Sequence, residues 1–74
     1  MERDTEQRRA IRRIFGEIDR PLTPTEVLEA ARTYVASMGL ATVYRNLKLL
    51  KDEGWLSSVE LPGEPDRYER SGKG

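Results

Sequence analysis

The sequence of 74 residues contains no cysteine and no histidine. The absence of cysteine excludes disulfides and thiolate metal sites, and the absence of histidine removes the commonest metal ligand and general base. No apolar run approaches the roughly 18 residues of a membrane span, and neither a signal peptide nor a glycine-rich phosphate loop is present. We therefore expect one small cytoplasmic domain with no membrane contact, no metal, no cofactor of its own and no enzymatic activity.

The chain has no net charge, but its charges are segregated. Residues 5–20 carry five arginines against three acids, residues 41–51 carry three cations and no acid, and residues 52–66 carry five acids and no base. The neutral total therefore conceals two cationic segments and one acidic segment. The segment at residues 41–51 predicts an anionic partner.

Hydrophobic spacing predicts two helices in the first half of the chain. The first covers residues 6–18, and Asp4 or Thr5 can cap its start. The second begins with a capping box at residues 23–26, with proline in the first helical position, and we expect it to end near residue 34 or 35. Its predicted buried stripe consists of Val27, Leu28, Ala31, Tyr34 and Val35.

A third helix is predicted over residues 41–53. Its apolar seam consists of Leu40, Val43, Leu47 and Leu50. At about 100° per residue, Arg45 and Lys48 project from the opposite side of the helix. Thr42 and Tyr44 lie on the two flanks of that exposed side. The helix therefore has one face for packing and one for an anionic partner, and its shape suits the major groove of DNA.

The pattern changes after Gly54, which ends the third helix. Residues 55–61 have strand character, residues 62–66 form a turn, and residues 67–70 can pair back as a second strand. Trp55 is expected to anchor this hairpin on the helices, because an isolated two-stranded hairpin is only marginally stable.

Three helices followed by a hairpin predict a mainly α fold with the winged helix-turn-helix arrangement. In this arrangement the first helix braces the other two, the third helix reads DNA, and the hairpin is the wing. We expect the domain to cover residues 1–70 and to be followed by a flexible end at residues 71–74.

Arg45 is the first candidate for a base contact, because an arginine on a helix in the groove can bind O6 and N7 of guanine together. Tyr44 can pack on a thymine methyl group or reach a phosphate with its hydroxyl, or it can instead cover the domain's own core. Thr42 and Lys48 suit phosphate contacts, and Arg8 can touch the DNA backbone from the first helix. For each exposed cation the alternative is an ordinary solvated charge.

Residues 39–47, with the sequence GLATVYRNL, resemble the signature of the ferric uptake regulator (Fur) family, and the similarity extends over about residues 5–70. The resemblance implies the winged-helix DNA-binding domain of a metal-responsive transcriptional regulator, usually a repressor that acts as a dimer on AT-rich palindromic operators. It also implies that Tyr44 and Arg45 approach bases. In the family a basic residue ahead of the first helix reads the minor groove, and the candidate for that role here is Arg3.

The same resemblance implies a C-terminal domain that dimerises and binds metal through segments rich in histidine and cysteine. These 74 residues contain no such segment, and a single carboxylate such as Glu69 does not make a metal site. We therefore expect a metal-binding dimer in the longer parent regulator and a monomeric or weakly associating isolated domain. The alternative function is a winged-helix module that docks on another protein and does not bind DNA.

Overall fold

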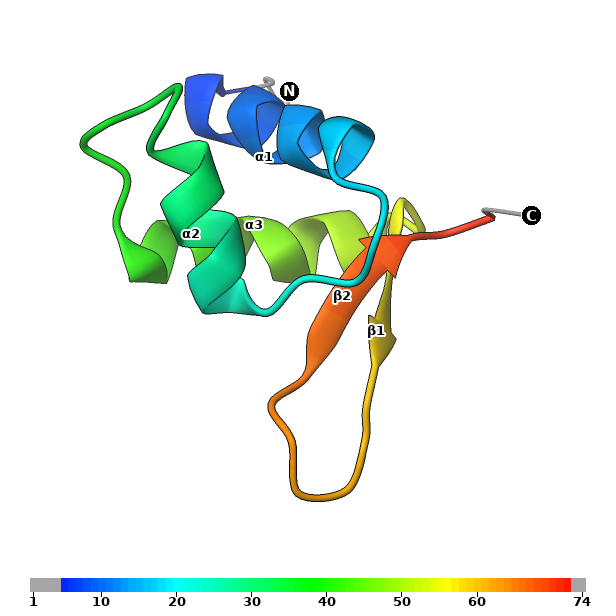
Figure 1. The fold of residues 1–74 in the computed structure, drawn as a ribbon. Coiled ribbons are helices and arrows are strands. Elements are labelled where there is room, and N and C mark those ends of the chain that lie inside the picture. The colour runs from blue at the N-terminus through cyan, green and yellow to red at the C-terminus, as the bar shows by residue number, and fades with distance from the viewer. Residues whose placement is uncertain (1–4, 73–74) are drawn as a thin grey trace.

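The computed structural model describes residues 5–72, in which three helices are followed by a two-stranded hairpin (Figure 1). The elements are α1 (Glu6–Glu17), α2 (Pro24–Ala31), α3 (Leu40–Asp52), β1 (Leu56–Val59) and β2 (Arg67–Arg70). In Figure 1 the helices form the upper body, and the loop between the antiparallel strands projects away from them. The predicted fold class, mainly α with a winged helix-turn-helix arrangement, is confirmed. None of the described helices is long and apolar enough to cross a bilayer.

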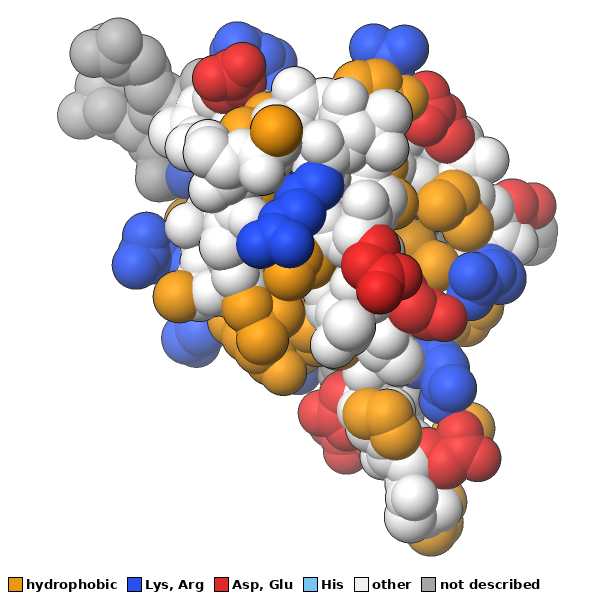
Figure 2. Space-filling model, turned by 60° about the vertical axis from the view of Figure 1, so that its left-hand side comes forward, with side chains coloured by type: hydrophobic (Ala, Val, Ile, Leu, Met, Phe, Trp, Pro, Cys, Tyr) orange, Lys and Arg blue, Asp and Glu red, His pale blue; other side chains and the backbone are white. Residues whose placement is uncertain are grey.

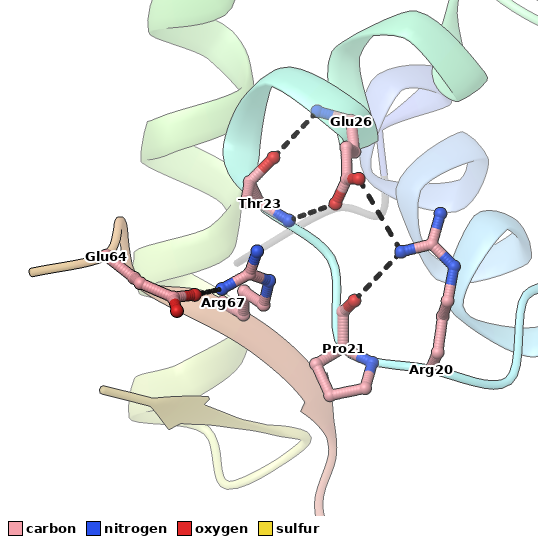
Figure 3. Close-up of polar contacts among 6 residues, drawn as sticks. All are labelled: Arg20, Pro21, Thr23, Glu26, Glu64 and Arg67. Carbon is pink, nitrogen blue, oxygen red and sulfur yellow. Dashed lines mark hydrogen bonds and ion pairs between the residues drawn. The ribbon is translucent and has the colours of Figure 1, made fainter. Parts of the chain in front are cut away.

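The starts of α1 and α2 follow the predicted capping signals. Of the two candidate caps of α1, Thr5 serves, since its hydroxyl accepts from the backbone N–H of Arg8 at 3.1 Å. At α2 the Glu26 N–H donates to the Thr23 hydroxyl at 3.2 Å, and the Thr23 N–H donates to the Glu26 carboxylate at 2.9 Å (Figure 3). Both halves of the predicted capping box are therefore present.

The predicted end of α2 is wrong, because the helix stops at Ala31 and turns occupy residues 32–34. The carbonyl of Ala31 accepts from both the Tyr34 N–H and the Val35 N–H at 2.9 Å. The bond from Tyr34 spans three residues instead of four, as in a tight turn, and the α-helix does not continue. Tyr34 is consequently exposed rather than part of the buried stripe, and its hydroxyl donates to the carboxylate of Glu17 at 2.8 Å. The segment after Ala31 contains β-branched and aromatic residues, which favour the helix less than alanine does.

The apolar side of α3 closes the core. Val43, Leu47 and Leu50 are fully buried, as predicted, against Ile11 and Ile14 of α1 and the other members of one hydrophobic cluster. Leu40, also expected in this seam, is instead exposed at the first residue of the helix. The helix runs one residue earlier at each end than predicted, and Gly54 follows it with φ +85, a left-handed conformation that glycine adopts without strain.

The hairpin is joined to the helical body by contacts that the sequence indicated only in part. The ring of Trp55 meets that of Phe15 edge-on at 6.5 Å, which confirms Trp55 as a packing anchor. Leu22, in the link between α1 and α2, forms a β-bridge with Tyr68 through two hydrogen bonds of 2.9 and 2.8 Å, and no such pairing was predicted. The Ser71 N–H donates to the Trp55 carbonyl at 3.0 Å, so hairpin contacts reach one residue past the predicted end of the domain.

Candidate nucleic-acid interface

The exposed side of α3 brings together four of the residues predicted to contact DNA. Tyr44, Arg45 and Lys48 are exposed, and Thr42 is half-buried at the edge of this side. Thr42 lies about one turn before Arg45, and Tyr44 one turn before Lys48, so the four side chains form a single surface. Tyr44 is 53 % exposed, so about half of the residue's surface is open to solvent.

The cations on this surface are open to an external partner. Within residues 5–72, the side chains of Arg45 and Lys51 form no hydrogen bond or ion pair. Lys48 approaches Asp52 at 3.4 Å, but both side chains are exposed, and a surface pair of this kind contributes little. The first turn of α3 carries no acid, so the partial positive charge of the helix N-terminus is uncompensated there. All of these features favour an anion.

The cations of the hairpin have partners within the molecule. Arg67 donates to Glu64 at 2.7 Å, and the guanidinium of Arg70 lies 4.7 Å from the centre of the Trp55 ring. The backbone hydrogen bond from Thr23 lowers the pKa of Glu26, and the charges of Arg20 and Arg67 lower that pKa further. Figure 3 shows that Arg67, at the loop end of β2, lies beside the start of α2.

Acidic groups of the hairpin lie beside the exposed side of α3. Burial raises the pKa of the Tyr68 hydroxyl, and the nearby Asp66, Tyr44 and Glu60 raise it further. Tyr44 of α3 and the carboxylates of Asp66 and Glu60 therefore lie near enough to the Tyr68 phenol to affect it electrostatically. Figure 2 shows the hairpin as a projection with acidic side chains along it. A polyanion would accordingly meet attraction at α3 and repulsion at the tip of the hairpin.

The structure places Arg8 differently from the other predicted contacts. Its side chain is only 6 % exposed, and its Nε donates to Oδ1 of Asn46 at 3.3 Å. Arg8 therefore lies between α1 and α3, and this burial does not favour the direct phosphate contact that we expected. Asn46 was missed by the sequence reasoning. Its spacing gave a signal, because it lies three residues after Val43 and four before Leu50, on the edge of the apolar seam.

Arg3, the predicted minor-groove residue, lies outside the described residues. No group of three or more histidine, cysteine, aspartate or glutamate side chains in the described part of the chain could hold a metal ion. The arrangement therefore offers a cationic helix surface, with an aromatic ring beside an arginine.

Comparison with known proteins links this geometry to one family. A profile of the Ferric uptake regulator family matches residues 2–73. The fold is similar to that of the Helicobacter pylori ferric uptake regulator Fur (TM-score 0.89, 25% identity, 97% of this chain and 48% of that chain). It is also similar to the ferric uptake regulator of Francisella tularensis (0.86, 27%, 99% and 56%) and to a zinc-bound manganese uptake regulator (0.89, 30%, 99% and 55%). The chain thus spans about half the length of these structures.

Proposed function

This chain belongs to the ferric uptake regulator family, and we propose that it serves as the DNA-binding part of a metal-responsive transcriptional regulator. In this proposal α3 enters the major groove of double-stranded DNA in the cytoplasm. The regulator is a repressor, and its operator is AT-rich and palindromic. The single observation that carries the proposal is the exposed side of α3, whose Arg45 has no partner elsewhere in residues 5–72.

The residues of this surface divide by role. Arg45 reads a guanine through O6 and N7, since its planar guanidinium can donate two parallel hydrogen bonds to that edge. Tyr44 packs beside it on a thymine methyl group, and its exposed ring supports this role. Thr42 and Lys48 hold phosphates, which fix the position of the helix without reading sequence. Arg3 is proposed to follow the minor groove, as the family resemblance implies.

We assign the metal response and dimerisation of the regulator to a second region, which corresponds to the half of the related structures that this chain does not cover. The Helicobacter pylori Fur structure is described as having three functional metal-binding sites. No candidate ligand cluster occurs among residues 5–72 of this chain. We propose that the chain on its own is monomeric or weakly associating, as the family resemblance implies for an isolated DNA-binding domain. It should bind one half-site with modest affinity, since it lacks the gain from two linked half-sites.

Selection from a random library of DNA duplexes tests this function. The immobilised chain should enrich a common sequence, and its affinity for that duplex should fall steeply with added salt as counterions are released. The rival function is a module that docks on a basic protein through the acidic hairpin. Absence of any enriched sequence, together with no DNA binding at low salt, would contradict the proposal and favour that rival.

A further inference from the structure

Two polar side chains are buried where α1 meets α3. Arg8 is 6 % exposed and Asn46 is 5 % exposed, and no other polar or charged side chain among the described residues is buried to this degree. Burying a charged group is unfavourable unless hydrogen bonds compensate for the lost water. In a domain with so small a core, an arginine at this position therefore requires an explanation beyond packing.

Hydrogen bonds to both the oxygen and the nitrogen of its side-chain amide hold Asn46 in place. Its Oδ1 accepts from Arg8 Nε at 3.3 Å, and its Nδ2 donates to the backbone carbonyl of Thr42 at 2.9 Å. The connection therefore runs from the first turn of α1, through Asn46, to the first turn of α3. An apolar contact tolerates small rotations of a helix about its axis, whereas a hydrogen-bonded contact of this kind is directional.

The rotational setting of α3 determines where its exposed side chains point. Asn46 is adjacent to Arg45 in the chain, and Thr42 is one turn before Asn46. A binding group must be held within about 0.5 Å and 10–20° of its productive geometry to retain full effect. The contact between Arg8 and Asn46 acts on the part of α3 that carries both the proposed base contact and a proposed phosphate contact.

We propose that Arg8 and Asn46 are positioning residues for sequence reading. Their buried hydrogen bond fixes the rotation of α3, so that Arg45 meets its base without either positioning residue touching DNA. This inference rests on the proposed function. It replaces the phosphate contact first expected for Arg8, and the two roles differ in a measurable way. A phosphate contact contributes to the salt dependence of binding, whereas a positioning contact contributes to the preference for one sequence.

The test uses the double variant Arg8→Met/Asn46→Leu, in which both partners are replaced by apolar groups of similar size. Such paired replacements are often neutral for stability, whereas single ones leave a buried polar group unsatisfied. Affinity is measured by fluorescence anisotropy for the duplex selected by the wild-type chain and for a scrambled duplex of the same composition. The preference for the selected duplex should fall about tenfold, comparable to one lost base contact. The salt dependence should stay unchanged.

Two further variants keep the test decisive if the double variant fails to fold. Arg8→Lys retains the charge but not the planar Nε donor, so it should lose preference while keeping the salt dependence. Arg13→Met removes an exposed arginine from the same helix and should leave the preference unchanged. The proposal is overturned if the folded variants keep the wild-type preference, or if affinity for both duplexes falls equally with a weaker salt dependence. A wild-type chain that selects no duplex would instead contradict the proposed function itself.

Discussion

The exposed side of α3 and the hairpin are neighbours that use their charges in opposite ways. On α3, Arg45 and Lys51 have no side-chain partner in the described chain, and Lys48 has only a loose one. On the hairpin, Arg67 is paired with Glu64 and Arg70 lies over Trp55. Both elements carry cations, but Arg67 and Arg70 of the hairpin have contacts within the molecule, whereas Arg45 and Lys51 of α3 form no hydrogen bond or ion pair in the described chain.

This difference in charge pairing bears on which element contacts DNA, a question that the fold alone leaves open. A winged helix offers two elements that could touch DNA, the third helix and the hairpin, and the topology alone does not decide between them. Here the occupancy of the charges favours α3 as the element that contacts DNA. The net charge of zero, which argues mildly against nucleic acid, follows largely from the five acids at residues 52–66, which lie outside the cationic segment at residues 41–51.

The largest expected effect is on the free energy of unfolding, to which a buried residue of α3 should contribute far more than an exposed residue of the hairpin loop. Leu47→Ala should lower the free energy of unfolding by about 2–5 kcal/mol, because Leu47 is fully buried and its truncation leaves a cavity. The matched control is Leu61→Ala. Leu61 is exposed in the loop of the hairpin, so this substitution should change the free energy of unfolding by less than about 0.5 kcal/mol. Urea unfolding followed by the fluorescence of Trp55 measures both. Equal losses would mean that the hairpin loop is packed rather than exposed.

Base reading by α3 is tested next. Arg45→Ala should weaken binding to the selected duplex by about 1–3 kcal/mol and relax the preference at one base pair, because one bidentate contact is lost. Lys51→Ala removes another exposed cation from the same helix and should leave the base preference intact. Anisotropy titrations and a repeated selection measure the two effects. An unchanged preference in Arg45→Ala would remove the base-reading role from Arg45.

A smaller effect is expected on the salt dependence of DNA binding, measured for one cation of α3 and one of the hairpin. Lys48→Ala should weaken binding to all duplexes alike and reduce the slope of log affinity against log salt by about one, as expected for one lost phosphate contact. Arg67→Ala should leave the slope unchanged, because Glu64 already holds that guanidinium at 2.7 Å. Titrations over a range of salt concentrations measure both slopes. If Arg67→Ala changed the slope as much as Lys48→Ala, the hairpin would be a phosphate contact after all.

Much of this fold follows from signals that act over a few residues. The hydroxyl of Thr5, the capping box of Thr23 and Glu26, and the left-handed Gly54 each involve a local interaction, and each could be predicted. The seam of α3 follows from helical periodicity alone. Four of the six side chains predicted for the candidate site, Thr42, Tyr44, Arg45 and Lys48, lie on one side of α3 for the same reason, since position on a helix depends only on spacing.

The remaining features depend on partners far away in the chain. The hydrogen bond of Arg8 with Asn46 spans 38 positions, and that of Tyr34 with Glu17 spans 17. Whether an arginine or a tyrosine is exposed or engaged is decided by such partners, and its own neighbours in sequence do not reveal them. The bridge between Leu22 and Tyr68 was missed for the same reason, because its hydrogen bonds need a strand that begins more than forty residues later.

The smallest expected effect concerns the junction where Arg67 of the hairpin faces Glu26 of α2. The pKa of Glu26 is lowered, first by the backbone hydrogen bond from Thr23 and then by Arg20 and Arg67. A carboxyl group whose pKa is lower in the folded state stabilises fully above its unfolded pKa, and this contribution is lost as pH falls through the folded pKa. Glu26→Gln keeps a capping amide but removes the charge.

Because the Glu26 side chain is 40 % exposed and water screens its charge, Glu26→Gln should lower the free energy of unfolding by no more than about 0.5 kcal/mol at pH 7, and the difference should shrink at pH 3. Glu29→Gln is the matched control on the same helix, where the described chain offers the carboxylate no partner, and its effect should be equally small at both pH values. Urea unfolding at the two pH values measures each difference. Because Arg67 makes the smallest contribution to the lowered pKa, Arg67→Ala should reduce the pH dependence that Glu26 confers only slightly. If it does not, the charge of Arg67 is not engaged at this junction, and the contrast between the hairpin and α3 is weaker than the structure indicates.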